Sequence, residues 1–179
     1  KSDRGILYGV FRLIRMLMCG QKIKDICVCE NPAAPLRMIN HWDNMAGDIE
    51  RGYSGNSFFY DDNNIIINDR TYMYARLMAS VGINAITINN VNVHAVETRL
   101  ITDTYLSQVK EISDIFNSYG IKLYLSINFA APVELGDTDN CDPLCEDVIK
   151  WWEKTTKHVY EVIPSFGGYL VKADSEGRP

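Results

Sequence analysis

The sequence is poor in histidine, carries no excess of positive charge and contains no long hydrophobic run. Only three of its 179 residues are histidine, and 18 Lys and Arg face 23 Asp and Glu, which gives a formal net charge of −5. Such a composition lacks the basic footprint that binds nucleic acid. The first apolar run, residues 6–11, ends at Arg12 and is too short to cross a membrane as a helix. We therefore expect neither nucleic acid nor a membrane as a partner.

The cysteine and glycine patterns do not indicate a metal or a cofactor. Cys27 and Cys29 lie one residue apart in an alternating apolar stretch, and no histidine pair stands near Cys141 and Cys145 as in a zinc motif. The acidic stretch at residues 61–64 lacks the spacing of a calcium loop. No phosphate-binding GxGxxG or GxxxxGK[ST] motif follows an expected strand. The sequence thus predicts no metal site and no cofactor.

Cysteine usage and the two ends of the chain bear on its origin. The five cysteines are an odd number, and no Asn-x-Ser/Thr sequon occurs. Both features favour a reducing compartment such as a bacterial cytoplasm, with secretion to the extracellular space as the alternative. The chain begins without Met and ends just after an expected strand, so we expect it to be a piece of a longer protein.

A proline-rich linker divides the chain. Before it, residues 6–18 repeat apolar side chains at helical spacing, and residues 23–29 alternate like a strand. Residues 31–35 contain two prolines, which suit neither a helix interior nor a strand ladder. We place a domain boundary there, which gives predicted units at residues 1–35 and 36–179.

The second unit alternates strands with helices. The pattern predicts strands at residues 36–40, 85–89, 121–127 and 168–171, and helices at 70–81, with Asp69 as the N-cap, 103–119 and 145–162. Such alternation predicts an α/β fold with parallel strands and crossover helices. An open doubly wound sheet and a barrel both fit. Because a complete (β/α)8 TIM barrel takes about 250 residues, four strands would form half of one.

Charged residues follow the last strand. Lys172, Asp174 and Glu176 alternate, so an extended chain places them on one face. A cation beside two carboxyl groups suits an anionic substrate, with one carboxyl group transferring a proton. A solvated strand end with local ion pairs is the alternative interpretation.

Polar and aromatic residues follow two other strands. His41 and Trp42 come directly after the first strand, where a ring beside polar groups resembles a platform for sugar binding, although both side chains could equally pack in the core. Asn90 and Asn92 follow the second strand and could bind hydroxyl groups, but asparagine also favours turns.

Several longer strings carry a specific resemblance. Residues 36–44 (LRMINHWDN), 49–53 (IERGY), 89–92 (NNVN), 121–129 (IKLYLSINF) and 171–177 (VKADSEG) resemble, in this order and at matching intervals, the α-glucuronidases of glycoside hydrolase family 67. The resemblance covers nearly the whole chain. It implies that residues 1–35 are the end of an N-terminal α/β domain and that residues 36–179 form the first half of a (β/α)8 barrel.

The resemblance also implies an activity. Members of the family release (4-O-methyl)glucuronic acid from xylooligosaccharides with inversion at the anomeric carbon and without a metal. The expected partner is therefore an oligosaccharide derived from glucuronoxylan. A homodimer would have to form through regions outside these residues.

Individual roles follow from the same resemblance. Glu176 matches the general acid that protonates the departing xylosyl oxygen. Lys172 matches the residue that pairs with the uronate carboxylate, and Trp42 matches a ring that lines the sugar pocket. The remaining expected substrate contacts are Asp174, His41, Asn90 and Asn92. An inverting mechanism needs a second carboxylate roughly 6.5–9.5 Å from the acid to activate water, and the resemblance places it beyond residue 179.

This division of the catalytic pair has consequences for the isolated chain. We expect it to be inactive without the base, and to fold poorly because a half barrel exposes a strand edge. Two other functions stay open from the sequence. One is a different glycosidase on the same barrel, although Lys172 favours an anionic sugar. The other is a carbohydrate-binding or degenerate half-barrel protein without catalysis.

Overall fold

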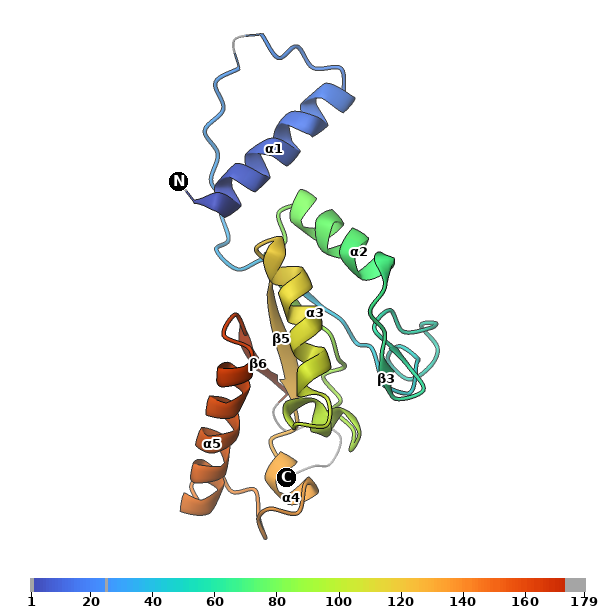
Figure 1. The fold of residues 1–179 in the computed structure, drawn as a ribbon, viewed down its shortest axis with the longest axis vertical. Coiled ribbons are helices and arrows are strands. Elements are labelled where there is room, and N and C mark those ends of the chain that lie inside the picture. The colour runs from blue at the N-terminus through green and yellow to red at the C-terminus, as the bar shows by residue number, and fades with distance from the viewer. Residues whose placement is uncertain (1, 25, 173–179) are drawn as a thin grey trace.

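The chain is built on a parallel sheet of four strands (Figure 1). The computed structural model describes residues 2–24 and 26–172. The strands follow the order β1-β4-β5-β6, and each neighbouring pair is parallel. They are β1 (Met38–Asn40), β4 (Ala85–Thr87), β5 (Lys122–Ile127) and β6 (Gly168–Val171). The prediction of an α/β fold with parallel strands is confirmed.

Helical connections join successive strands. The chain from β1 to β4 contains the antiparallel hairpin β2 (Tyr60–Asp61) and β3 (Asn64–Ile65), followed by α2 (Asp69–Ser80). The connection from β4 to β5 contains the 3-10 helix η1 (Glu97–Ile101) and α3 (Leu106–Ser118), and that from β5 to β6 contains α4 (Ala131–Glu134) and α5 (Glu146–Val162). Figure 1 shows α3 along the sheet, with α2 and α5 to either side. Because the strands are parallel, the loops that follow them gather at one edge of the sheet.

The core lies between the sheet and α3. Leu123 and Leu125 of β5 are fully buried, as are Ile112 and Phe116, which stand one helical turn apart on α3. The chain returns to the sheet through Gly167, where an added Cβ would lie 2.2 Å from a ring carbon of Tyr124. A side chain at that position would collide with the ring, so the contact between β5 and β6 requires glycine.

Within residues 36–172 the predicted helices and strands are present, and they differ from the structure at their ends. Helix α2 is capped by Asn68 instead of Asp69, because the Asn68 side chain accepts the N–H of Arg70 at 2.9 Å and the Thr71 hydroxyl accepts the N–H of Asn68 at 3.2 Å. Helix α3 begins at Leu106, later than predicted, because the chain before it turns through η1.

The strand predicted at residues 23–29 is wrong for the described residues there. Residues 26–29 belong to neither of the two sheets in the described part of the chain, and Ile26 and Val28 are exposed. Apolar alternation predicts which side chains share a face, but a strand also needs a neighbour for its backbone N–H and C=O groups. This segment has no such neighbour within residues 2–24 and 26–172.

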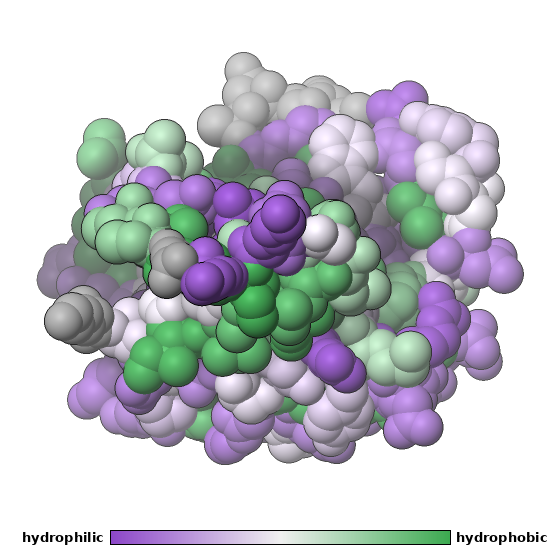
Figure 2. Space-filling model, turned by 90° about the horizontal axis from the view of Figure 1, so that it is seen from above, coloured by the Kyte–Doolittle hydropathy of each residue, from purple (hydrophilic) through white to green (hydrophobic). Residues whose placement is uncertain are grey.

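Helix α1 (Asp3–Met18) lies at one end of the molecule, next to α2 (Figure 1). Leu7 and Phe11 pack against the core. Six further apolar side chains of α1 are exposed, namely Ile6, Val10, Leu13, Ile14, Leu17 and Met18. Figure 2 views this end and shows an apolar patch there. Among the described helices, none is both long enough and apolar enough to span a membrane.

Candidate active site

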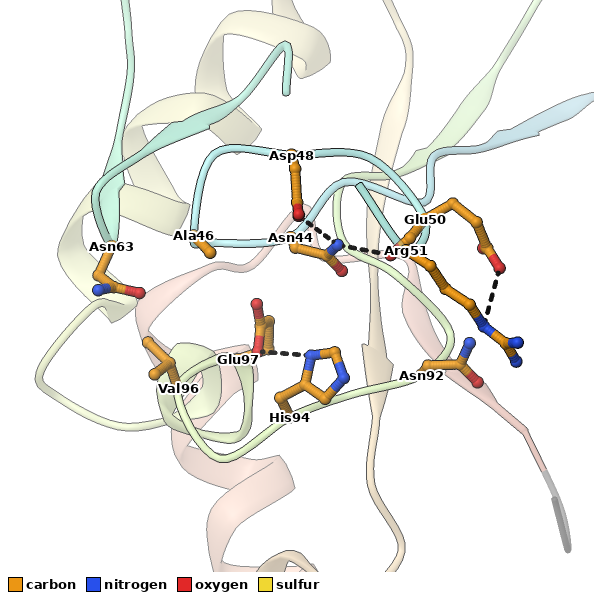
Figure 3. Close-up of a pocket in the computed structure, with 10 residues that line it drawn as sticks. All are labelled: Asn44, Ala46, Asp48, Glu50, Arg51, Asn63, Asn92, His94, Val96 and Glu97. Atoms are coloured by element: carbon orange, nitrogen blue, oxygen red, sulfur yellow. Dashed lines mark hydrogen bonds and ion pairs between the residues drawn. The ribbon is translucent and has the colours of Figure 1, made fainter. Parts of the chain in front are cut away.

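A polar pocket lies at the carboxyl edge of the sheet, between the loops that follow β1 and β4 (Figure 3). Its volume is about 390 Å³, within the range of about 300–1,000 Å³ that is typical of small-molecule sites. The residues that line it are Asn44, Ala46, Asp48, Glu50, Arg51, Asn63, Asn92, His94, Val96 and Glu97. Three carboxylates and one guanidinium make this lining rich in groups that bind hydroxyls and anions.

Buried Asp43 holds the loop that follows β1. Its carboxylate oxygen Oδ2 accepts hydrogen bonds from Ser57 Oγ at 2.6 Å and from the N–H of Phe58 at 2.5 Å. Its backbone carbonyl accepts the N–H of Asn90 at 2.8 Å. Asp43 therefore connects the start of this loop to its end and also to the loop that follows β4.

Two asparagines shape the pocket through hydrogen bonds within the protein. The Asn90 amide donates to Asn44 Oδ1 at 2.9 Å, and Asn90 Oδ1 accepts the N–H of Asn92 at 2.9 Å. The Asn44 amide in turn donates to Asp48 Oδ1 at 2.6 Å and to the carbonyl of Glu50 at 2.7 Å. Asn90 is 1% exposed and does not line the pocket, so its contribution in this structure is to hold the two loops together.

The expected cation reaches the pocket from the last strand. Lys172 directly follows β6, and its ammonium group donates a hydrogen bond to Asn92 Oδ1. Asn92 lines the pocket and follows β4, and β5 lies between β4 and β6 in the sheet. The Lys172 side chain therefore reaches from the end of β6 past β5. The structure thus brings Lys172 and Asn92 together. Asp174 and Glu176 lie outside the described residues.

Trp42 stands beside the pocket. Its carbonyl accepts the N–H of Glu50 at 2.8 Å, which pairs the end of β1 with the loop that carries Glu50 and Arg51. The Trp42 residue is 39% exposed, and it is not one of the residues that line the pocket in the described part of the chain. Its ring is therefore accessible at the same edge of the sheet.

His41 lies behind the strand end and does not line the pocket. Its Nδ1 is 2.7 Å from the carbonyl of Thr87, and its Nε2 is 2.7 Å from the hydroxyl of Tyr74. The edge of its ring packs against Phe59, with the ring centroids 5.0 Å apart. Burial lowers the pKa of His41 below 6.5, more than the Thr87 carbonyl and Asp43 raise it. Both ring nitrogens are thus engaged by the protein.

The pocket contains residues that were not among the substrate contacts expected from the sequence, including His94, which we expected to be structural or exposed. Asp48, Glu50 and Arg51 belong to the loop after the first strand. Barrel enzymes build their sites from such loops, so the sequence could have indicated these residues. His94 and Glu97 lie farther along the chain after β4. They enter the pocket only because the chain turns into η1, and no periodic pattern in the sequence reports that turn. Within the described residues, no group of three or more His, Cys, Asp and Glu side chains is arranged to hold a metal ion.

Comparison with known proteins points to one family. The chain matches the family model of the glycosyl hydrolase family 67 middle domain over residues 16–179. It is 45% identical over 185 residues to alpha-glucuronidase A of Emericella nidulans and 44% identical over 187 residues to alpha-glucuronidase of Hypocrea jecorina. It is also 45% identical over 181 residues to probable alpha-glucuronidase A of Aspergillus fumigatus.

These similarities extend along the whole chain but not along the whole of the relatives. Each of the three alignments covers 100% of this chain, 21% of the Emericella and Aspergillus proteins and 22% of the Hypocrea protein. The chain therefore spans about a fifth of the length of the curated relatives that it matches.

The contacts of Asp43 predict a large stability effect. Asp43→Ala leaves the Ser57 hydroxyl and the Phe58 N–H without their acceptor, and it should lower the free energy of unfolding by about 3 kcal/mol. Asp43→Asn keeps one acceptor oxygen and should cost about 1 kcal/mol. Urea unfolding of the full-length parent protein measures both. Asp114→Ala, which removes an exposed ion pair on α3, is the control and should change stability by less than about 0.5 kcal/mol. Equal effects of the Asp43 and Asp114 variants would contradict this assignment.

The environment of His41 predicts a pH dependence. Its pKa is lowered in the folded state, so below pH 6.5 the unfolded chain binds a proton that the folded chain does not. Stability should therefore fall as the pH drops from 6.5 toward the lowered pKa, with a slope of up to about 1.4 kcal/mol per pH unit from this group. His41→Gln should make the slope shallower when urea unfolding is followed from pH 7.5 to 5.5. An unchanged slope would show that His41 is not the group responsible.

Proposed function

The chain belongs to glycosyl hydrolase family 67, and on that basis we propose that it is part of an α-glucuronidase. The substrate that we propose is a xylooligosaccharide that carries glucuronic acid, with or without a 4-O-methyl group. The reaction is hydrolysis of the α-glycosidic bond with inversion. Residues 1–35 would be the end of a preceding α/β domain, and residues 36–179 the first half of a (β/α)8 barrel.

The contact between Lys172 and Asn92 is the observation that carries this proposal. It brings the cation that follows the last strand to Asn92 in the pocket lining, which also contains Arg51, paired with Glu50 at 3.7 Å. A uronic acid differs from a neutral sugar by one carboxylate, and cations recognise that group through charge-assisted hydrogen bonds. The asparagine and carboxylate oxygens of the same pocket match the hydroxyl groups of a sugar.

The remaining roles follow from the proposed reaction. Glu176 would donate a proton to the departing xylosyl oxygen, and Asp174 would support substrate binding. Trp42 would offer an accessible ring to the sugar. Asn90 and His41 would act by position, because Asn90 joins the two pocket loops and His41 packs behind the first strand end.

The proposed reaction is tested with the full-length parent protein and aldobiouronic acid as substrate. We expect release of glucuronic acid, with the β-anomer formed first as seen by proton NMR. Glu176→Gln should retain substrate binding but lose cleavage, because the amide cannot donate the proton. The isolated 179-residue chain should be inactive, because the second carboxylate that we propose for the reaction would come from later strands of the barrel. Binding without cleavage by the unsubstituted parent would favour a carbohydrate-binding protein instead.

The role of Lys172 is tested by substrate choice. Lys172→Ala should lower kcat/KM for the glucuronide by about 10- to 100-fold, because the uronate loses a charge-assisted hydrogen bond. The same substitution should affect cleavage of the corresponding neutral glucoside far less. Lys150→Ala, which removes an exposed cation on α5, is the matched control and should leave both substrates unaffected. An equal loss on the charged and the neutral substrate would contradict recognition of the uronate by Lys172.

A further inference from the structure

Glu97 is a buried carboxylate whose two oxygens have different surroundings. Its side chain is 3% exposed, and it stands at the start of η1. Oxygen Oε1 accepts the N–H of Met45 at 2.7 Å, which connects η1 to the loop after β1. Oxygen Oε2 has no hydrogen-bond partner among the residues that the structure describes. The His94 ring lies near this oxygen, with Nδ1 3.8 Å from Oε2.

An unpartnered oxygen on a buried carboxylate is costly. Removing a charged group from water is unfavourable unless hydrogen bonds replace those that it made with water. The contact with Met45 needs only one acceptor, which a neutral amide could supply. The second oxygen therefore calls for a donor, and the residue that carries it lines the pocket.

The position of Glu97 within the pocket suggests where that donor comes from. Figure 3 draws Arg51 and Asn92 on one side of the pocket and Glu97 on the other. A uronic acid bound with its carboxylate toward Arg51 and Lys172 would keep that negative charge away from Glu97. Its ring hydroxyls, which are donors, would then point toward the carboxylate.

We propose that Oε2 of Glu97 accepts a hydrogen bond from one ring hydroxyl of the bound uronic acid. Glu97 is then a substrate-binding residue that also holds the loop after β1 through its other oxygen. This inference is conditional on the proposed function, since it takes a glucuronide as the ligand of the pocket.

The test combines one substitution with deoxygenated substrates. The full-length parent protein and its Glu97→Gln variant are assayed on aldobiouronic acid and on three analogues, each lacking one hydroxyl of the uronic acid ring at position 2, 3 or 4. Gln keeps an acceptor for the Met45 N–H but removes the charge. We expect Glu97→Gln to lower kcat/KM on the complete substrate by about 10- to 100-fold. With the unsubstituted protein, kcat/KM should be lower by a similar factor on the one analogue that lacks the hydroxyl bound by Glu97. With the Glu97→Gln variant, kcat/KM on that analogue should be less than about threefold below its value on the complete substrate.

A matched control separates binding from support of the fold. Glu134 accepts a hydrogen bond from Thr98 of η1 at 3.0 Å, so Glu134→Gln perturbs the same 3-10 helix without touching the pocket lining. In the Glu134→Gln variant, the decrease in kcat/KM from the complete substrate to each analogue should be the same as in the unsubstituted protein. If Glu97→Gln lowers kcat/KM equally on all four substrates, or has no effect, the inference is wrong while the proposed function stands. If the unsubstituted parent cleaves none of the four, the proposed function fails, and this inference fails with it.

Discussion

The carboxylate of Asp43 fixes the geometry of the pocket. The loop that follows β1 contains little regular structure before β2, and Glu50 within it adopts a left-handed backbone conformation with φ of 59°. Ordering such a segment has an entropic cost of about 1–2 kcal/mol per residue, which local hydrogen bonds must offset. Asp43 supplies two of these bonds through one oxygen and reaches the β4 loop through its carbonyl. The wall that carries Asp48, Glu50 and Arg51 depends on that anchor.

Charge decides how a ligand can be oriented in this pocket. The buried Glu97 carboxylate is poorly screened and would repel an anionic sugar, whereas the Glu50 carboxylate already pairs with Arg51 at 3.7 Å. Arg51 and, through Asn92, Lys172 supply opposite charge. An anionic ligand would be repelled least with its carboxylate toward Lys172 and its hydroxyl donors toward Glu97. Specificity in such a site comes from repulsion of the wrong orientation as much as from attraction of the right one.

Much of the architecture could be predicted from the sequence, because the signals were local. Apolar periodicity predicted the helices and strands of residues 36–172. Lys172 and Asn92 were found because they are polar residues that closely follow predicted strands. Two results were beyond such reasoning. His41 and Trp42 are neighbours, so an extended chain sends their side chains to opposite sides, and only the tertiary structure decides which one faces the core. Glu97 enters the pocket because η1 turns back toward Met45, and that contact joins residues 52 positions apart.

Burial across the sheet bears on the architecture of the parent. Every residue of β4 is buried, whereas the edge strands β1 and β6 contain no fully buried residue. Parallel strands normally have both faces and both edges covered, so half-exposed edge strands call for further neighbours. Closure into a barrel would supply them on both edges at once, and it would bring further strand ends to the edge where Lys172 and the pocket lie. The structural need to cover β6 and the chemical need for a second carboxylate near Glu176 would then be met by the same additional strands.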